Sequence, residues 1–322
     1  MKKILITGAN SYIGMSFDSY LKQWPDKYMV DTMDMIDGSW KEKSFSGYDA
    51  VYHVAGIAHS DHGKISPERA QLYYQVNRDL AVETAKKAKD EGVKQFIFMS
   101  SASVYGKSAP IGKHKMITRE TPFSPENSYG DSKVQAEQGI MPLQSEDFKV
   151  VILRPPMIYG KGCKGNYTTL SALAKKLPCF PYVDNKRSML YIENLVEFVK
   201  LMVDNEEHGI FWPQNSEYTN TSQMVAMIAA VHGKRMILVK GLSWALKIVS
   251  RMTALVDKAF GSFCCDQEMS SYKQNYCIVN LADSIKETEG IACKSWFFPN
   301  TFIRKISGSI RCAGNWSTGA MR

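Results

Sequence analysis

The chain has 322 residues, 44% of them hydrophobic, and a formal net charge of +8 at pH 7. A hydrophobic share of this size is ordinary for a globular protein, and the length is ample for a large core. The positive charge fits an anionic ligand and would also suit nucleic acid or an acidic membrane surface, but it is spread along the chain, and we expect no nucleic-acid partner.

The first residues do not resemble a cleavable signal, because the apolar run after Met1-Lys2-Lys3 stops at Thr7-Gly8. The seven cysteines are scattered and form no C-x-x-C pattern. We therefore expect reduced thiols and a cytoplasmic protein. His59 and His62 lie in a polar loop without Cys or acid partners at metal-ligand spacing, so no metal site is expected.

Residues 2–7 form an apolar run with β-branched members, which predicts a short buried strand. A glycine turn and a helical pattern follow, and together they predict a dinucleotide-binding fingerprint. Gly8 permits the tight turn, Gly14 lets the helix pack closely on the sheet, and the helix N–H groups face a pyrophosphate. Ser11 replaces the middle glycine of the usual pattern; its Cβ crowds a phosphate, while its hydroxyl is able to donate a hydrogen bond. The candidate cofactor contacts in this turn are Gly8, Asn10, Ser11, Tyr12, Ile13 and Gly14.

A second strand is predicted at residues 28–34. An acid about 20 residues beyond the last glycine is expected to bind the adenosine ribose hydroxyls, and Asp34 stands at that position. Asp31 is the weaker candidate because it falls inside the strand. A carboxylate repels a 2′-phosphate and no arginine adjoins Asp34, so the sequence predicts NAD rather than NADP.

A third strand at residues 49–53 runs into Val54, Ala55 and Gly56, whose small side chains allow the backbone to approach the adenine and ribose. We therefore expect Ala55 and Gly56 to contact the cofactor. His53 ends this strand, and we interpret it as structural rather than catalytic.

The fourth strand, residues 95–99, leads into a serine-rich turn that contains Ser101 and Ser103. Hydroxyls at the carboxyl end of a parallel strand point into the crevice where doubly wound sheets bind ligands. Further along, Tyr129 and Lys133 are four residues apart, so they share one face of a helix. A nearby positive charge lowers the pKa of a phenol, normally about 10, and makes it a tunable proton donor and acceptor. Alone, such a pair is also compatible with an exposed helix surface.

In combination, these motifs resemble the extended short-chain dehydrogenase/reductases, specifically the NAD-dependent epimerase/dehydratase family that acts on nucleotide sugars. The resemblance implies a Rossmann-like, doubly wound parallel α/β sheet, a smaller carboxy-terminal domain that closes over the sugar nucleotide, and a homodimer. The matching segments, in family order, are Thr7 to Gly14, Asp34, His53 to Gly56, Ser101 to Gly106, Glu120 to Pro122, Tyr129 to Lys133, Arg154 to Gly160 and Arg187 to Leu195.

The same resemblance implies that Ser101, Tyr129 and Lys133 are catalytic. Tyr129, as phenolate, takes the proton of the C4 hydroxyl while hydride passes to the nicotinamide. Lys133 holds the nicotinamide ribose and lowers the phenol pKa, and Ser101 orients the sugar oxygen. By resemblance, Tyr129, Lys133 and Pro156 also contact the cofactor, and the substrate contacts are Ser103, Asn166 and Arg187.

Family members that eliminate water resemble Thr-Asp-Glu at the serine position, where this chain has Ser101-Ala102-Ser103. We therefore expect no 4,6-dehydratase activity. The favoured interpretation is a C4 epimerase of a UDP-hexose or UDP-N-acetylhexosamine in the synthesis of surface polysaccharide precursors. The alternatives are an NAD(P)H-dependent 4-ketoreductase and a non-catalytic, NAD-binding regulatory protein.

The motifs predict a cofactor-binding domain at residues 1–160, to which later segments such as 187–205 return. A substrate-binding domain is expected at 161–290, followed by a tail of unknown structure at 291–322. Helical patterns run from Ile192 to Val203 and from Thr221 to Val231.

Residues 241–263 are apolar but are interrupted by Lys247, Arg251 and Lys258, so they do not form a transmembrane span. One alternative is a basic amphipathic helix on a membrane surface, which leaves peripheral association open. The other is packing within the small domain or at a subunit interface, and this is the interpretation we favour.

Overall fold

A computed structural model describes residues 1–57, 65–252, 256 and 259–291. Residues 1–291 form one compact unit. The expected tail, the loop histidines His59 and His62, and two of the cysteines, Cys293 and Cys312, lie outside the described residues. The expected boundary at residue 160 stays a prediction.

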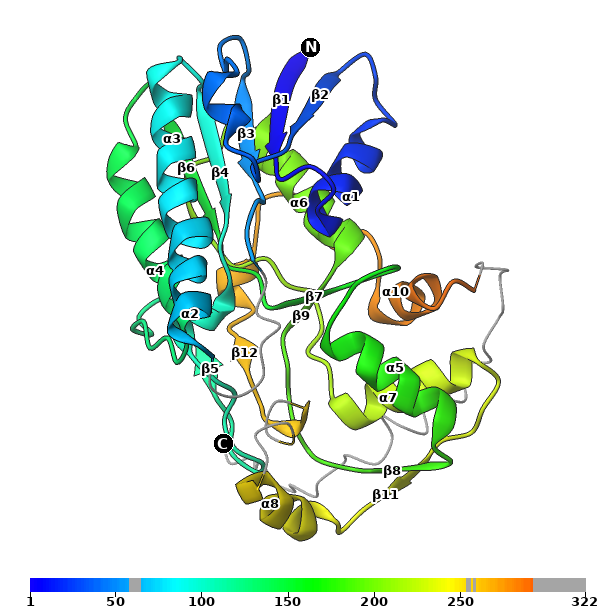
Figure 1. Ribbon diagram of the computed structural model, residues 1–322. Helices are drawn as coiled ribbons and strands as arrows, with labels where there is room; N and C mark the ends of the chain where they lie inside the picture. The colour runs from blue at the N-terminus through cyan, green and yellow to red at the C-terminus, as the bar shows by residue number, and fades with distance from the viewer. Residues whose placement is uncertain (58–64, 253–255, 257–258, 292–322) are drawn as a thin grey trace, which may run out of the picture. The chain divides into compact units, whose positions relative to one another are not determined.

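A parallel sheet of six strands forms the centre of the larger half, with the order β10-β6-β4-β3-β1-β2 (Figure 1). The order reverses between β1 and β3, and this switch point is where doubly wound sheets bind ligands. The predicted Rossmann-like architecture is confirmed. The strands are β1 (Lys2–Thr7), β2 (Tyr28–Met33), β3 (Ala50–His53), β4 (Gln95–Met99), β6 (Lys149–Leu153) and β10 (Gly209–Phe211).

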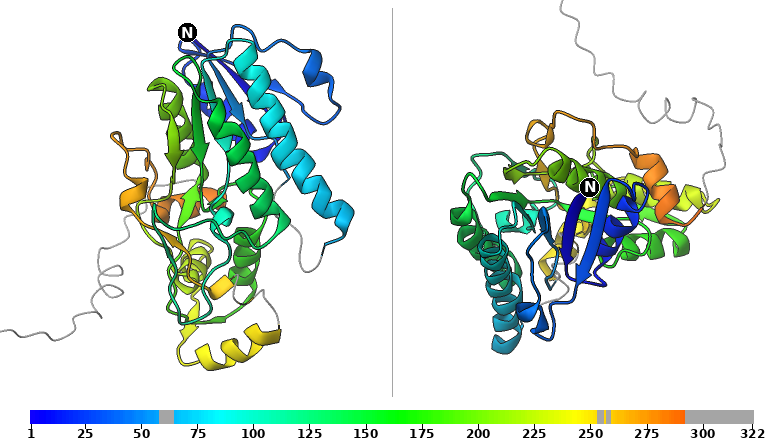
Figure 2. Two further views of the ribbon diagram at one scale, coloured as in Figure 1. Left: turned by 90° about the vertical axis from the view of Figure 1, so that its left-hand side faces the viewer. Right: turned by 90° about the horizontal axis from the view of Figure 1, so that it is seen from above.

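Helices cover both faces of this sheet (Figures 1 and 2). Side chains alternate between the faces of a strand, so Ile4 joins the core cluster that contains Phe17 and Leu195, whereas Leu5 joins the cluster that contains Ala85 and Ile140. The first cluster lies under α1 (Tyr12–Leu21) and α6 (Ile192–Asp204). The second lies under α3 (Leu80–Asp90) and α4 (Ser128–Ile140), which follow α2 (Pro67–Tyr74) and the π-helical turn η2 (Gln75–Asp79).

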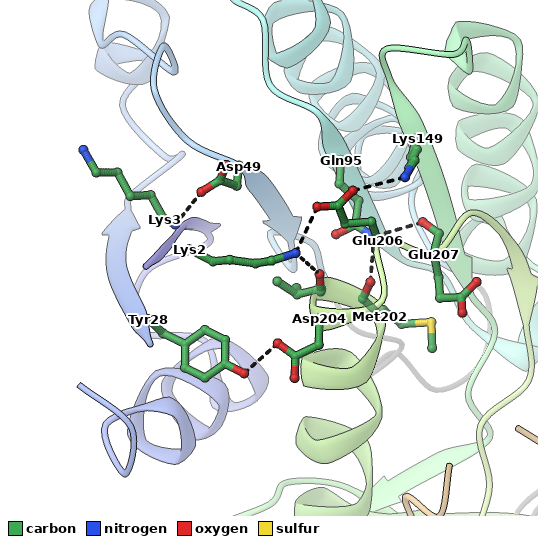
Figure 3. Close-up of polar contacts among 11 residues, drawn as sticks. Lys2, Lys3, Tyr28, Asp49, Gln95, Lys149, Met202, Asp204, Glu206 and Glu207 are labelled. Atoms are coloured by element: carbon green, nitrogen blue, oxygen red, sulfur yellow. Dashed lines mark hydrogen bonds and ion pairs between the residues drawn. The ribbon is translucent and has the colours of Figure 1, made fainter. Parts of the chain in front are cut away.

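The end of α6 is hydrogen-bonded to residues at the amino-terminal ends of the sheet strands (Figure 3). The last carbonyls of a helix have no partner within the helix. Lys2 Nζ donates to the Val203 carbonyl at 2.7 Å, and Gln95 Nε2 donates to the carbonyls of Met202 and Glu207 at 2.9 Å each. The end of α6 is therefore tied to β1 and β4, and the predicted return of 187–205 to the cofactor domain stays a prediction.

The remaining elements build a smaller half and the connections to it. The predicted helix from Thr221 to Val231 is confirmed as α7, and α6 confirms the other. No helix in the described part of the chain has the length and apolar character needed to cross a bilayer. The other helices are α5 (Asn166–Lys176), α7 (Thr221–Val231), α8 (Ser243–Met252) and α10 (Leu281–Thr288). Two-stranded pairings join β5 (Met116–Ile117) to β12 (Cys264–Cys265), β7 (Met157–Tyr159) to β9 (Met189–Tyr191) and β8 (Cys179–Pro181) to β11 (Ile237–Val239). Short 3₁₀ turns are η1 (Ser39–Glu42), η3 (Ala102–Tyr105), η4 (Met141–Leu143) and η5 (Glu268–Ser270).

Candidate active site

The turn between β1 and α1 requires its glycines. Gly8 has φ of +106°, and a Cβ on it would lie 2.7 Å from the backbone nitrogen of Ala55. Asn10 also adopts a left-handed conformation, with φ of 65°. Ser11 caps α1, because its Oγ accepts the Gly14 N–H at 3.1 Å. Capping uses the oxygen as acceptor, and a hydroxyl keeps its proton for donation to a phosphate.

Tyr12 and Ile13 contribute to this turn mainly through the backbone. Both side chains pack against the core cluster under α1. The groups that they would present to a pyrophosphate are therefore their first-turn N–H groups, which lack partners within a helix. The Tyr12 hydroxyl is buried and has no hydrogen-bond partner among the described residues. Burial raises the pKa of Tyr12. A Cβ on Gly160 would lie 2.6 Å from this hydroxyl.

Asp34 lies just beyond β2, beside the glycine turn. The Met33 carbonyl accepts the Gly8 N–H at 2.8 Å, which holds the strand end against the turn. Asp34 is exposed and accepts the Ile36 N–H at 2.9 Å. Asp31 instead accepts the Tyr48 hydroxyl at 2.8 Å. The carboxylate available to a ribose is therefore that of Asp34, and this donor set fits NAD.

Asn77 holds the loop after β3, and the sequence analysis did not identify it. It lies in η2 and is fully buried. Its Oδ1 accepts the Ile57 N–H at 2.8 Å and its Nδ2 donates to the Ile57 carbonyl at 3.2 Å. A Cβ on Gly56 would lie 2.9 Å from Asn77 Oδ1 and 3.5 Å from Lys133 Nζ. The predicted cofactor loop is thus clamped next to the predicted catalytic lysine.

The helix α4 positions Tyr129 against the serine turn. Asn127 caps α4 by accepting the Gly130 N–H at 2.9 Å, which fixes where the helix begins. The hydroxyls of Ser101 and Ser103 hydrogen-bond to the Tyr129 phenol, and Ser103 Oγ donates to Ser101 Oγ at 2.9 Å. The structure therefore brings together three of the predicted site residues.

The pKa of Tyr129 differs from the expectation drawn from the spacing. Burial raises the pKa of the Tyr129 phenol, and the hydrogen bonds from Ser101 and Ser103 offset part of that rise. Lys133 was expected to lower this pKa. Instead its Nζ donates to the Met99 carbonyl at 2.8 Å and lies 4.6 Å from the centre of the Phe98 ring.

Lys133 is buried, with 5% of its surface exposed. Burial lowers the pKa of Lys133 to about 8, and the negative charge of Glu137 opposes that shift. Glu137 follows one turn later on α4 and accepts the Ser100 hydroxyl. Arg154 Nη2 lies 2.5 Å from Glu137 Oε2, with side-chain exposures of 7% and 3%. Arg154 Nη1 also donates to the Tyr105 hydroxyl at 2.6 Å. A buried ion pair therefore supports the helix behind the lysine.

The surroundings of His53 fit the structural role expected for it. Its Nδ1 is 2.8 Å from Thr7 Oγ1, and its ring contacts the rings of Phe96 and Phe98 on the neighbouring strand. Burial, together with the charge of Lys133, lowers the pKa of His53 to about 3. The imidazole is therefore neutral at physiological pH.

The remaining predicted residues stay predictions. Pro156 is buried just after β6. Asn166 is exposed at the first position of α5. Arg187 is half-buried, and its Nη1 donates to the Gly261 carbonyl at 2.9 Å. Burial lowers the pKa of Arg187. Across the described ranges, no group of three or more His, Cys, Asp or Glu side chains is arranged to hold a metal ion.

Comparisons with known proteins agree with this geometry. A family model described as the NAD dependent epimerase/dehydratase family matches residues 4–212. The chain is 29% identical over 289 residues to a UDP-glucose 4-epimerase of Vibrio cholerae, covering 82% of this chain and 87% of that protein. It is 29% identical over 244 residues to the N-acetyl-alpha-D-glucosaminyl-diphospho-ditrans,octacis-undecaprenol 4-epimerase of Escherichia coli O157:H7, covering 70% of this chain and 71% of that protein.

Among solved structures, the fold is similar to that of UDP-glucuronic acid 4-epimerase from Bacillus cereus in complex with NAD. The TM-score is 0.67 at 18% identity, and the match covers 90% of this chain and 98% of that chain. At this level of identity the likeness shows the fold.

Proposed function

Because the chain belongs to the NAD-dependent epimerase/dehydratase family, we propose that it is a C4 epimerase of a UDP-hexose or UDP-N-acetylhexosamine that serves surface polysaccharide synthesis. One observation carries the proposal: the Tyr129 phenol is hydrogen-bonded to Ser101 and Ser103 and precedes Lys133 by one helical turn. This is a complete proton-transfer set at the carboxyl end of a parallel sheet.

The cofactor is NAD, and the residues at the switch point fit it. The turn around Gly8 and the first turn of α1 would hold the pyrophosphate. Asp34 would accept hydrogen bonds from the adenosine ribose, and Lys133 would hold the nicotinamide ribose. Bound NAD supplies reversible oxidation of the sugar at C4.

The chain's own residues would then move one proton. Tyr129 Oη accepts the proton of the C4 hydroxyl and later returns it to the same oxygen, so the residue is regenerated in each turnover. The Ser101 hydroxyl, whose oxygen accepts from Ser103, is left to donate to the phenol oxygen and stabilises its deprotonated form. The relay Ser103 Oγ–H to Ser101 Oγ keeps the second hydroxyl oriented.

The surroundings of the phenol support the absence of dehydration. Ala102, between the two serines, is buried and apolar. The carboxylates of α4 are already paired, since Glu137 binds Arg154 and Asp131 accepts the Tyr74 hydroxyl at 2.8 Å. An elimination needs its own acid and base beside the sugar, and these carboxylates are committed elsewhere.

A second candidate substrate is the same kind of sugar linked to a polyprenyl diphosphate. The name of the Escherichia coli relative describes such a lipid-linked sugar. The observation that favours it here is an exposed apolar helix, α8, with Trp244 66% exposed. Both substrates carry a diphosphate, which suits the positive charge of the chain.

The test is to incubate the purified protein, without added cofactor, with UDP-glucose, UDP-galactose and their N-acetyl forms, and to follow the products by NMR. We expect interconversion of C4 epimers. No conversion in these incubations, together with activity on 4-keto sugars and stoichiometric consumption of added NADH in a second incubation, would instead identify a 4-ketoreductase. Accumulation of a 4-keto-6-deoxy sugar would identify a dehydratase, and conversion of only a polyprenyl-diphosphate sugar would identify the second substrate.

Location and assembly are also proposals. We expect a cytoplasmic homodimer with a cofactor domain at 1–160 and a substrate domain at 161–290. The cysteines in the described part of the chain, which are Cys163, Cys179, Cys264, Cys265 and Cys277, are unpaired. Unpaired thiols are typical of a reducing compartment, and sizing the purified protein by light scattering tests the dimer.

A further inference from the structure

One end of the smaller half exposes large apolar side chains on neighbouring segments. Trp244 and Ile248 on α8 are 66% and 52% exposed, Leu242 just before it is 39% exposed, and Ile237 on β11 is 60% exposed. In Figure 1 and in the left view of Figure 2, α8 lies at the lower edge of the molecule. These four residues define what we call the α8 surface.

Packing of the subunit does not explain the outward face of α8. Leu246 packs against the large core cluster and holds the helix on the body of the protein. Residues four apart share a helix face, so Trp244 and Ile248 lie together, on the side opposite Leu246. The helix is therefore apolar on a second face as well, and that face is solvent-exposed.

The segment that carries this surface is basic. Residues 218–256 contain no Asp or Glu. The same stretch contains five basic residues, which are Lys234, Arg235, Lys240, Lys247 and Arg251. Lys234, Arg235, Lys240 and Lys247 are exposed. A Trp and aliphatic residues flanked by Lys and Arg are typical of helices that lie in the interface of an anionic membrane.

We propose that the α8 surface docks on an anionic lipid bilayer. Trp244, Ile248 and Leu242 would enter the headgroup boundary, and Lys240 and Lys247 would face the lipid phosphates. The sequence interpretation favoured packing within the small domain or at a subunit interface. A two-fold symmetric interface would bring this basic segment against its own copy, with no acid between 218 and 256 to neutralise it.

The proposal stands apart from the proposed reaction, because vesicle binding is measured without substrate. Full-length protein is sedimented with vesicles of phosphatidylcholine alone and with vesicles that also contain phosphatidylglycerol. We expect binding only to the anionic vesicles and its weakening by salt, since the electrostatic part is screened. The double variant Trp244→Ser/Ile248→Ser should bind the anionic vesicles at least about tenfold more weakly than the wild type.

Two matched controls distinguish vesicle binding through the α8 surface from nonspecific binding. Ile36→Ser removes another exposed apolar side chain, 90% exposed, on the loop after β2, and should bind like the wild type. Arg235→Glu/Lys240→Glu should reduce binding to anionic vesicles, whereas Lys43→Glu, which changes an exposed lysine of the sheet half, should not.

Circular dichroism verifies the fold of each variant, and light scattering reports its assembly. Equal binding to neutral and anionic vesicles, or wild-type binding by the Trp244→Ser/Ile248→Ser variant, overturns the proposal. Dissociation of a dimer by that variant also overturns it and assigns the surface to a second copy of the chain. Conversion of soluble UDP-sugars should stay unchanged in all of these variants, so a failure of the proposed reaction is recognised separately.

Discussion

Arg154 donates hydrogen bonds to both carboxylate oxygens of Glu137, which lies one helical turn after Lys133. The pair joins the end of β6 to α4, the helix that carries the proposed catalytic residues, and is almost fully buried. Removing one partner of such a pair leaves the other charge uncompensated in the interior. The same carboxylate also lies close enough to Lys133 to raise the pKa of its ammonium. The ion pair is therefore expected to affect both the stability of the fold and the proposed catalysis.

Turnover should fall as the pH rises through about 8. The pKa of Lys133 is lowered to about 8, so the ammonium is present below that pH and is lost above it. Glu137→Gln removes the charge that raises this pKa and should move the falling limb to lower pH. The check is a pH profile of turnover for both proteins. Asp131→Asn, on the same helix, should leave the limb in place, and an unmoved limb in Glu137→Gln would contradict the assignment.

Replacing Tyr129 with Phe should lower turnover by roughly 10²- to 10⁴-fold, because the phenol is the proposed proton donor and acceptor. NAD binding should stay close to that of the wild type, since the glycine turn and Asp34 are untouched. Steady-state kinetics and a cofactor titration provide the two measurements. Tyr74→Phe removes a neighbouring phenol that pairs with Asp131 and should keep its activity; unchanged turnover in Tyr129→Phe would falsify the role.

The Arg154–Glu137 pair should show strong coupling in a double-mutant cycle. Arg154→Met and Glu137→Leu should each lower the free energy of unfolding by about 3–5 kcal/mol, because each leaves its partner unpaired and buried. The double variant should lose much less than the sum of the two, since no uncompensated charge remains. Urea unfolding of the four proteins measures the cycle. Additive losses would mean that the two residues act separately.

Cofactor preference should depend on Asp34. The wild type should bind NAD more tightly than NADP, because the carboxylate accepts ribose hydroxyls and repels a 2′-phosphate. Asp34→Asn should lower the ratio of the NADP dissociation constant to the NAD dissociation constant by roughly tenfold or more. Fluorescence titrations measure the ratio. Asp31→Asn is the matched control, because Asp31 is paired with Tyr48; tighter NADP binding by the wild type would show that Asp34 faces away.

The central sheet was predictable because its strands carry strong apolar runs. β1 and β4 lie at the predicted residues, and β2 and β3 differ by one residue at an end. β10 was not predicted, since three residues give neither an alternating pattern nor a long apolar run. Its existence depends on pairing with β6, a contact between segments far apart in the chain.

The predicted site residues came from local motifs, and the misses came from tertiary packing. Spacing placed Tyr129 and Lys133 on one helix face but gave no measure of burial, so the direction of the Tyr129 pKa shift was wrong. The signal for Asn77 was only an asparagine within a helical stretch, a position where its side chain competes with the backbone. Its clamp on Ile57 becomes visible only when η2 is placed beside the loop after β3.

The edge strand β10 also bears on how much of the chain the central sheet requires. The edge strand β10 and the helix α6, which packs on one face of the sheet, both follow residue 187 in the chain. A fragment ending at residue 160 would expose β6 as an open, apolar edge, which is a template for aggregation. Residues 1–160 therefore lack an edge strand and a covering helix that complete this sheet, and they are not a self-contained unit.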